Sequence, residues 1–393
     1  MEKIITLCIM VTMASGVLMP PLGFLSVLGV LILFIIWDQT NGILRNIVLN
    51  KQLVIFLIFM FISVFFSNLK YSSIAFFIIL ILEILYYSMV IYYISKKGVN
   101  SLFNALNYIA IIASSYGIYQ FISGKLQVNK HWTGYSESLS SICRVYSTLY
   151  NPNVFAAYLV ISICFIICWI ITMDKSHLKN VSLILCSISL IFTYSRGAFV
   201  SLLAALIIVY LIKRDNRLII YGVLMIMFFV IFNNGTAYER IDIANINKDS
   251  SSLYRLEIWR TSFRIFMDNP IFGNGIGTLW YSISNMSSRL WGVIYHAHNL
   301  LLHFAAETGV LGLISFLWIF ENLTTTSYKA VKNTEDSIVK FVALSTIGSC
   351  TAIMVHGLID ATVVLPTLSL ILMNYYGLSC YALGILKLNT LNT

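Results

Sequence analysis

Runs of apolar residues follow one another along almost the whole chain, and short groups of charged, proline or glycine residues separate them. A helix needs about 20 mostly apolar residues to cross the hydrocarbon core of a bilayer. The pattern therefore predicts an all-α, polytopic membrane protein with about 12 transmembrane helices. The predicted spans lie near residues 4–19, 22–37, 52–67, 73–94, 101–123, 152–173, 180–194, 197–212, 218–234, 297–320, 339–364 and 367–386.

Lysine and arginine residues indicate which side of the membrane each short loop faces. Short cytoplasmic loops are enriched in both residues, whereas long loops do not follow this rule. With the N-terminus inside, every second short loop carries lysine or arginine, and the intervening short loops have few. We therefore expect both termini in the cytoplasm. The loop residues predicted to be cytoplasmic are Arg45, Lys51, Lys96, Lys97, Lys175, Lys179, Lys213, Arg214, Arg217, Lys329, Lys332 and Lys340.

One long polar segment interrupts the apolar pattern, from residue 235 to residue 296, between spans nine and ten. Its aromatic residues argue against disorder, and a loop of this length is usually functional. No fixed-period repeat separates the chain into further units. We expect a single membrane domain over residues 1–393, with residues 235–296 as an extracytoplasmic loop. The aromatic residues are Tyr254, Trp259, Trp280, Tyr281 and Trp291.

The composition excludes several classes of protein. The chain is 59% hydrophobic and 10% charged, whereas soluble domains carry roughly 25% charged residues. Soluble enzymes, secreted scaffolds and nucleic-acid-binding modules are therefore excluded. The net charge of +9 is mainly a consequence of topology, because the excess lies in the predicted cytoplasmic loops. Most of the seven cysteines lie within apolar runs, which indicates packing residues rather than zinc or redox sites.

Within the long loop, residues 253–268 have the spacing of an amphipathic helix. Apolar residues recur three and four positions apart and form one stripe along the predicted helix. We expect this helix to lie on the membrane surface with the stripe toward the lipid. The stripe consists of Leu256, Trp259, Phe263 and Phe266.

Three arginines of this predicted helix differ in their surroundings. Arg260 and Arg264 share the polar face with Glu257 and Asp268, at spacings that favour pairs on a solvated surface. Arg255 projects beside the apolar stripe instead. It either binds an anion, for which a diphosphate suits the planar guanidinium, or extends its charge to the membrane interface.

Two further arginines lie at the predicted outer boundary of the membrane. Arg144 precedes span six, and Arg196 lies in the tight turn between spans seven and eight. Positive charge is otherwise sparse on this side, so Arg196 is expected to meet an anion. That anion is a substrate, a lipid headgroup or the carboxylate of Asp360.

A glycine-rich segment, residues 269–277, follows the amphipathic helix. Alternate glycines can present backbone N–H groups to a phosphate. The segment does not have the GxGxxG spacing and no strand precedes it, so a tight turn is the favoured interpretation.

Histidines gather where span ten begins and where span eleven ends. His296 and His298 open span ten, while His356 and Asp360 lie one turn apart near the outer end of span eleven. A zinc site is one alternative, because His296, His298 and His356 are possible ligands, although no carboxylate or cysteine completes the set convincingly. An interfacial histidine at a helix end is a second alternative. We favour a general base, for which imidazole is suited at neutral pH.

The start of the helix decides which histidine faces the outer cavity. If Asn299 caps the helix, His298 is free to face that cavity. If the helix begins before residue 296, then His296, His303 and Glu307 share one face and His298 points the other way.

Four motifs in order resemble the O-antigen ligase/polymerase superfamily, whose members are bacterial membrane glycosyltransferases acting on polyprenyl-diphosphate-linked glycans. The similarity extends over about residues 140–365. The motifs are Arg144–Leu159, Tyr194–Ala198, Arg255–Gly277, and His298-Asn299 with Glu307, Thr308, Gly309 and Gly312.

This resemblance implies a GT-C-like membrane fold and an active site on the extracytoplasmic side. It implies that Arg144, Arg196 and Arg255 bind the diphosphate of the donor lipid. His298 would be the base that takes a proton from the acceptor sugar hydroxyl. The implied reaction inverts the anomeric centre and uses no metal or other cofactor. Residues expected to support these groups are Asn299, Glu307, His356 and Asp360.

The superfamily includes polymerases and ligases. We favour a polymerase of O-antigen or capsule type, which joins undecaprenyl-diphosphate-linked repeat units into surface polysaccharide. The long loop carries no large appended domain, which disfavours the ligases whose acceptor is a protein. The alternative is an O-antigen ligase that transfers the glycan to lipid A core. The expected location is the bacterial inner membrane, where a chain-length regulator or a flippase is a possible partner.

Two other classes of protein are less well supported. A polytopic lipid-glycan transporter would have paired proline or glycine breaks in its two halves, and none are evident. A purely structural subunit would not bring three arginines and a histidine to one face of the membrane.

Overall fold

The computed structural model describes residues 2–41, 50–124, 144–173, 176–232, 250–286 and 294–384, and its regular elements are helices. The predicted all-α class is thus confirmed for these residues. The helices are α1 (Glu2–Leu18), α2 (Pro20–Asn41), α3 (Lys51–Phe66), α4 (Lys70–Lys97), α5 (Val99–Ser123), α6 (Pro152–Thr172), α7 (His177–Phe192), α8 (Arg196–Lys213), α9 (Asn216–Phe232), α11 (Ser250–Asp268), α12 (Leu279–Met286), α13 (Leu300–Asn333), α14 (Ser337–Gly357), the 3₁₀ helix η4 (Thr362–Val364) and α15 (Pro366–Ala382).

Each predicted span overlaps one of the helices α1 to α9 and α13 to α15, and the eleventh, residues 339–364, also includes the turn after α14 and η4. Within the described residues, the helices α4, α5, α6, α8, α13 and α14 are long and apolar enough to cross a membrane. Shorter apolar helices are α1, α2, α3, α7 and α9. The chain is therefore a multi-pass membrane protein, while twelve crossings and a GT-C-like arrangement stay predictions. Residues Arg45, Lys125, Lys130, Cys143, Lys175, Trp291 and Lys387 lie outside the described residues.

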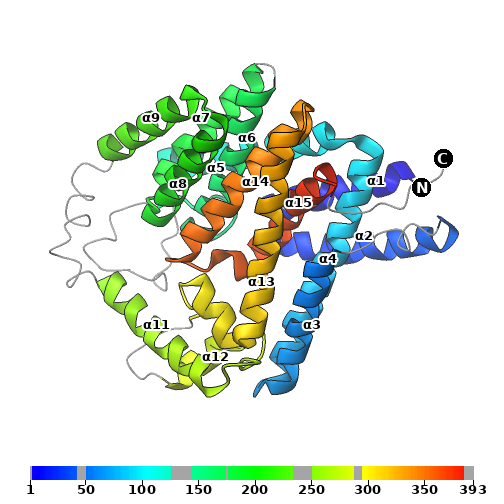
Figure 1. Cartoon of the computed structure of the whole chain (residues 1–393), viewed down its shortest axis with the longest axis vertical. Helices are drawn as coiled ribbons and strands as arrows, with labels where there is room; N and C mark the ends of the chain where they lie inside the picture. Colours follow the sequence, from blue (N-terminus) through cyan, green and yellow to red (C-terminus); the bar gives the residue numbers. More distant parts are fainter. Residues whose placement is uncertain are drawn as a thin grey trace.

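The helix α6 lies at the centre of the bundle, packed against α7, α8 and α14 (Figure 1). Most of its residues are buried, from Val154 through Cys168. A helix that is apolar all round is expected where other helices surround it on every side. This central helix fixes the position of the segment that precedes it, which carries Arg144.

Polar side chains begin several helices by accepting hydrogen bonds from free backbone N–H groups. Asn50 is the N-cap of α3, Asn151 of α6, Asn299 of α13 and Asp336 of α14. Such caps satisfy donors that the first turn of a helix leaves without partners. The cap at Asn299 confirms that the helix starts after His298, so the alternative of an earlier start is wrong.

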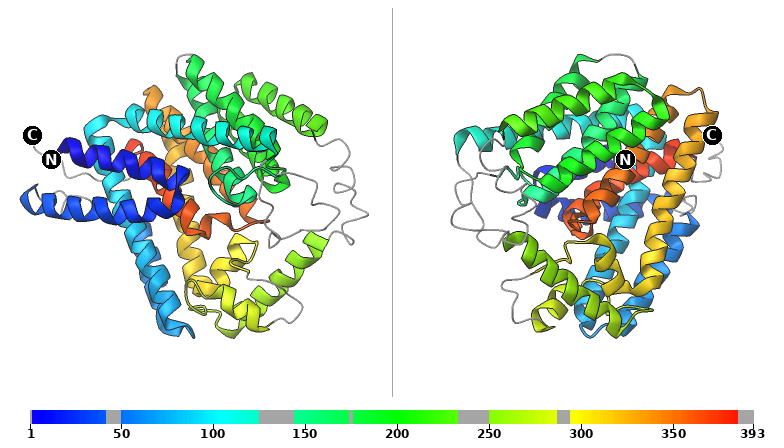
Figure 2. Two further views of the ribbon diagram at one scale, coloured as in Figure 1. Left: turned by 180° about the vertical axis from the view of Figure 1, so that it is seen from behind. Right: turned by 60° about the vertical axis from the view of Figure 1, so that its left-hand side comes forward.

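Residues 250–286 form a separate layer at one end of the bundle, which we call the α11–α12 unit (Figure 2). It packs mainly against the first turns of α13. The predicted helix over residues 253–268 is confirmed as part of α11, but the face packed on α13 carries Ile258 and Ile265. In the predicted stripe, Leu256 and Phe263 are exposed. Lipid contact of that stripe stays a prediction.

The helix α13 is broken at Gly309, whose φ is 66° and whose ψ is −173°. The carbonyl oxygens of Pro270 and Ile271 accept hydrogen bonds there, from the backbone N–H of Val310 (2.8 Å) and of Leu311 (3.5 Å). A side chain at position 309 would collide with the Ile271 carbonyl, so the close approach requires glycine. The break separates a short segment, residues 300–308, from the long remainder of the helix.

A mainly apolar cavity of about 340 Å³ lies between α3, α4, α13, α14 and α15. Phe56, Phe304 and Phe316 line it, and the same wall carries His303 and Glu307. The cavity thus reaches the short segment of α13 that follows the cap at Asn299.

Candidate active site

His298 directly precedes Asn299, the N-cap of α13, and has a left-handed backbone conformation with φ of 49°. Two contacts hold this unusual conformation. The Trp259 indole donates a hydrogen bond to the His298 carbonyl oxygen at 3.1 Å, and Asn299 donates from its side chain to the Leu358 carbonyl at 3.1 Å. Strained backbone of this kind is common where a side chain must be aimed at a reaction centre.

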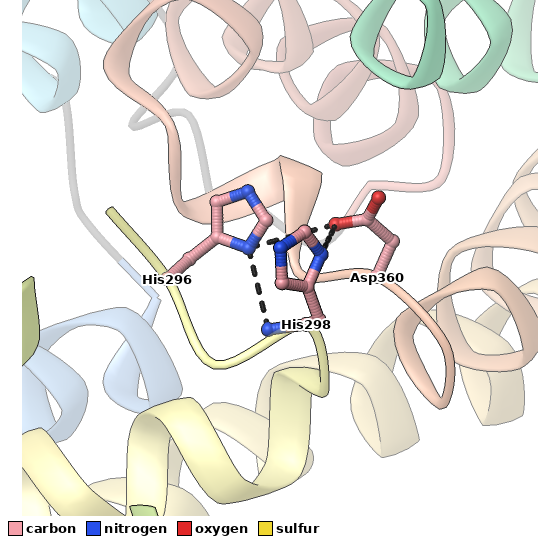
Figure 3. A group of neighbouring side chains, drawn as sticks. All are labelled: His296, His298 and Asp360. Carbon is pink, nitrogen blue, oxygen red and sulfur yellow. Dashed lines mark hydrogen bonds and ion pairs between the residues drawn. The ribbon is translucent and has the colours of Figure 1, made fainter. Parts of the chain in front are cut away.

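The ring of His298 meets a buried carboxylate. Its Nδ1 lies 3.2 Å from Oδ1 of Asp360, which the turn after α14 supplies (Figure 3). Because a carboxylate accepts a hydrogen bond from Nδ1–H, this contact leaves Nε2 as the nitrogen available to a substrate. The pair has the arrangement of a base and its orienting carboxylate.

His296 lies on the other side of the same carboxylate, with Nδ1 3.5 Å from Oδ1 of Asp360. Burial, followed by the neighbouring His298, lowers the pKa of His296 to about 3. Its ring is therefore neutral at neutral pH, and its Nδ1 accepts the backbone N–H of His298 at 3.3 Å. We therefore interpret His296 as a neutral residue that holds the backbone of His298 through this hydrogen bond.

Asp360 stays ionised in this buried position. Burial alone would raise its pKa, but the hydrogen-bonded His298 and the positive charge of Arg255 stabilise the carboxylate and hold the pKa well below its usual value. Its second oxygen, Oδ2, accepts a hydrogen bond from the side chain of Asn153 at 2.7 Å. The carboxylate is thus fixed through both oxygens.

Arg144 reaches the same group through Asn153. Its Nη2 donates to Oδ1 of Asn153 at 2.8 Å, and its Nε donates to the carbonyl of Thr193 at 2.9 Å. The segment that carries Arg144 is itself held by the hydrogen bond from the N–H of Val145 to the carbonyl of Phe192 at 3.0 Å. The predicted arginine and the predicted base therefore belong to one network of hydrogen bonds.

Arg196 is the first residue of α8, and the predicted turn between spans seven and eight is residues 193–195. Its side chain is exposed. The next residue, Gly197, lies against the ring of His356, which a Cβ atom at position 197 would approach to 3.2 Å. The backbone beside Arg196 therefore borders the site at the end of α14, where His356 is buried.

Arg255 lies in the second turn of α11, close enough for its positive charge to lower the pKa values of both His296 and Asp360. Its Nε is buried and has no hydrogen-bond partner within the described part of the chain. A buried guanidinium donor without a partner is costly unless a ligand supplies an acceptor. Arg260 and Arg264, on the polar face, are exposed.

Glu307 lies apart from His298 and holds the glycine-rich turn. Its carboxylate accepts the backbone N–H groups of Gly277 (2.8 Å) and Leu279 (2.9 Å), and it lies 3.3 Å from Nε2 of His303. These N–H groups are the ones that a phosphate would need. The segment is therefore a turn docked on α13, as favoured from the sequence.

The donor atoms of His296, His298 and Asp360 all lie within 4.8 Å of one another, a set that could hold a metal ion. The sequence interpretation that no carboxylate completes such a set is thus wrong, because Asp360 comes from a distant turn. The Arg255 guanidinium opposes a bound cation, however, and the His298–Asp360 contact is an ordinary hydrogen bond. We interpret the three residues as a hydrogen-bonded group.

The structure brings Arg144, His298, His356 and Asp360 together with Arg255, and it places Arg196 at the border of this group. Asn153 and Trp259 contact the group directly, and the sequence alone assigned no role in it to either. The sequence does contain a sign of the importance of Asn153, because it is a polar residue in the first turn of an otherwise apolar helix.

Comparison with known proteins agrees with this picture. Residues 181–317, about a third of the chain, match the family model described as O-antigen ligase. The matched range contains Arg196, Arg255, His298 and Glu307. A search of curated proteins found no significant match. The members of the matched family are glycosyltransferase-like enzymes. The match thus confirms the resemblance to the O-antigen ligase/polymerase superfamily over residues 181–317.

Proposed function

We propose that the protein is an inverting, metal-independent glycosyltransferase that polymerises undecaprenyl-diphosphate-linked oligosaccharide units into surface polysaccharide. The observation that carries this proposal is the imidazole of His298, oriented by the buried carboxylate of Asp360, beside the guanidinium groups of Arg144 and Arg255. Such a group can remove a proton at one point and neutralise a leaving anion at another.

In the proposed reaction, Nε2 of His298 takes the proton of an acceptor sugar hydroxyl. The hydroxyl oxygen attacks the anomeric carbon of the donor, and the bond from that carbon to the diphosphate oxygen breaks. The electron pair of this bond leaves with the diphosphate. Attack on the face opposite the leaving group inverts the anomeric centre. Asp360 stabilises the imidazolium that forms.

Arginine residues would bind the diphosphate and stabilise the charge that develops on it. Among the described residues, Arg255 has a buried donor without a partner. Arg144 is held by Asn153 and by the Thr193 carbonyl, and Arg196 begins α8 at the border of the site. Asn299 and Glu307 would act indirectly, because they fix the start of α13 and the adjoining turn. His356 would support the turn at Gly197.

The donor lipid has an apolar chain, and the 340 Å³ cavity beside α13 has mainly apolar walls. We expect part of that chain to bind there, close to the bilayer. The location that fits this substrate is the bacterial inner membrane, with the active site on the extracytoplasmic side and both termini in the cytoplasm.

A second candidate is an O-antigen ligase, which transfers the glycan to lipid A core. The description of the matched family favours it directly. Both reactions use the same donor and the same base, and they differ in the acceptor alone.

One experiment separates these candidates. Purified protein in detergent is incubated with undecaprenyl-diphosphate oligosaccharide as the sole substrate, with a metal chelator present, and the products are resolved by size. A ladder of lengthened glycans is expected of a metal-independent polymerase. Transfer only after addition of lipid A core would identify a ligase. Activity that requires an added metal ion would contradict the proposed mechanism, and no transfer under either condition would contradict the proposed function.

A further inference from the structure

The side chain of Asn153 lies between the two charged groups of the site. It accepts a hydrogen bond from Nη2 of Arg144 at 2.8 Å through Oδ1, and it donates one to Oδ2 of Asp360 at 2.7 Å through Nδ2. Asp360 in turn contacts His298 at 3.2 Å. Three contacts in series therefore join a diphosphate-binding arginine to the base.

The chemistry of the amide allows only one orientation of Asn153. Guanidinium groups have no acceptor and carboxylates have no donor, so the oxygen must face Arg144 and the nitrogen must face Asp360. Reversal of the amide would lose both hydrogen bonds. Aspartate would keep the bond to Arg144 and lose the bond to Asp360.

The backbone holds Asn153 as firmly as its side-chain partners do. Its N–H donates to Oδ1 of Asn151 at 2.8 Å, and the preceding residue, Pro152, has its φ fixed by the proline ring. It lies in the first turn of α6, the helix at the centre of the bundle. The amide is thus a fixed point against which the carboxylate can be aligned.

The two oxygens of Asp360 have different partners: Oδ1 lies near His298 and His296, and Oδ2 accepts from Asn153. A carboxylate held at one oxygen alone can rotate, whereas one held at both cannot. The orientation of the base therefore depends on Asn153, although Asn153 does not contact the substrate in the proposed reaction.

We propose that Asn153 is a positioning residue for glycan transfer, which aligns the Asp360 carboxylate with His298 and fixes it relative to Arg144. This inference rests on the proposed function and deepens it. It predicts a change in turnover rather than in donor binding, because Arg144 keeps its bond to the Thr193 carbonyl.

The test compares Asn153→Asp and Asn153→Ala in the full-length protein, with kcat and the donor KM measured separately. Both variants should lower kcat by about 10- to 100-fold, the usual effect of misplaced catalytic groups. The donor KM should change less than about threefold, since the arginines stay in place. Asn153→Asp should not exceed Asn153→Ala in kcat.

A matched control is Gln120→Ala. Gln120 also has an amide with two hydrogen bonds, to the backbone N–H and carbonyl of Ser147, in the segment between Arg144 and α6. This variant should lower the melting temperature and leave kcat unchanged. A loss of kcat equal to that of Asn153→Ala would show general loosening and would overturn the proposal.

Wild-type kcat in Asn153→Asp would also overturn it, because a purely structural residue tolerates this nearly isosteric change. Should Asn153→Asp fail to fold because two carboxylates then meet, Asn153→Ala carries the test, since it adds no charge. A wild-type kcat in folded Asn153→Ala would contradict the proposal. The wild-type protein is assayed in parallel, so its failure to transfer glycan would refute the proposed function rather than the role of Asn153.

Discussion

At the scale of single residues, His298 and His303 differ in what their rings meet. His298 faces the buried Asp360, whereas His303 contacts Glu307 on the wall of the apolar cavity. We expect His298→Ala to lower kcat by about 100- to 10,000-fold, the range for loss of a general base. His303→Ala should retain activity within a few-fold in the same transfer assay. The reverse order of effects would place the base at His303.

The arginines of α11 permit a similar comparison within one helix. Arg255 has a buried Nε without a partner in the described structure, whereas Arg260 is exposed. Arg255→Ala should abolish transfer while the purified protein keeps its melting temperature, because the buried donor serves the ligand rather than the fold. Arg260→Ala should behave like wild type. Equal activity in both variants would exclude Arg255 from diphosphate binding.

At the scale of helices, the break in α13 is the feature most sensitive to one substitution. A Cβ atom at Gly309 would meet the Ile271 carbonyl, in a backbone conformation that is nearly exclusive to glycine. The conformation alone should cost Gly309→Ala roughly 1–3 kcal/mol. Gly29→Ala, in α2, is the control, because a Cβ atom there would meet no atom of another described segment within 4 Å. Thermal unfolding in detergent should show a lower midpoint for the first variant alone.

The helices themselves could be predicted from the sequence, because each apolar run is bounded by charged residues or by glycine and proline. The break at Gly309 could not, since it depends on contact with Pro270 and Ile271 from another segment. The packed face of α11 was also missed: Ile258 and Ile265 contact α13, whereas the more evident stripe with Leu256 and Phe263 is exposed.

At the scale of the whole molecule, sidedness is the main prediction that awaits measurement. Tyr150 is exposed before α6, on the predicted outer side, and Glu335 is exposed between α13 and α14, on the predicted cytoplasmic side. In a background with Cys8→Ser and Cys143→Ser, an impermeant thiol reagent added to spheroplasts should label Tyr150→Cys and spare Glu335→Cys. Opened membranes should allow both to react. Labelling of Glu335→Cys alone in spheroplasts would invert the topology.

For the candidate site, sequence patterns predict the residues but not the contacts between them. His298, Asp360 and the arginines could be predicted as candidates because charge is rare in apolar surroundings. Their connections could not, because Asn153, His298 and Asp360 lie far apart along the chain and no periodicity relates them. Asp360 was therefore expected beside His356 or Arg196, whereas its carboxylate contacts His298 and Asn153.

The α11–α12 unit is anchored to α13 and, through hydrogen bonds from Ser72 and Ser73 to the carbonyls of Gly277 and Ile276, to the start of α4. Further contacts join it to the end of α3, where Phe272 stacks on Phe66 with ring centroids 4.6 Å apart and the N–H of Ile276 donates to the hydroxyl of Ser63. The same unit carries Trp259, which donates to the His298 carbonyl. A change in how the unit docks on α3, α4 and α13 would therefore also change the candidate site.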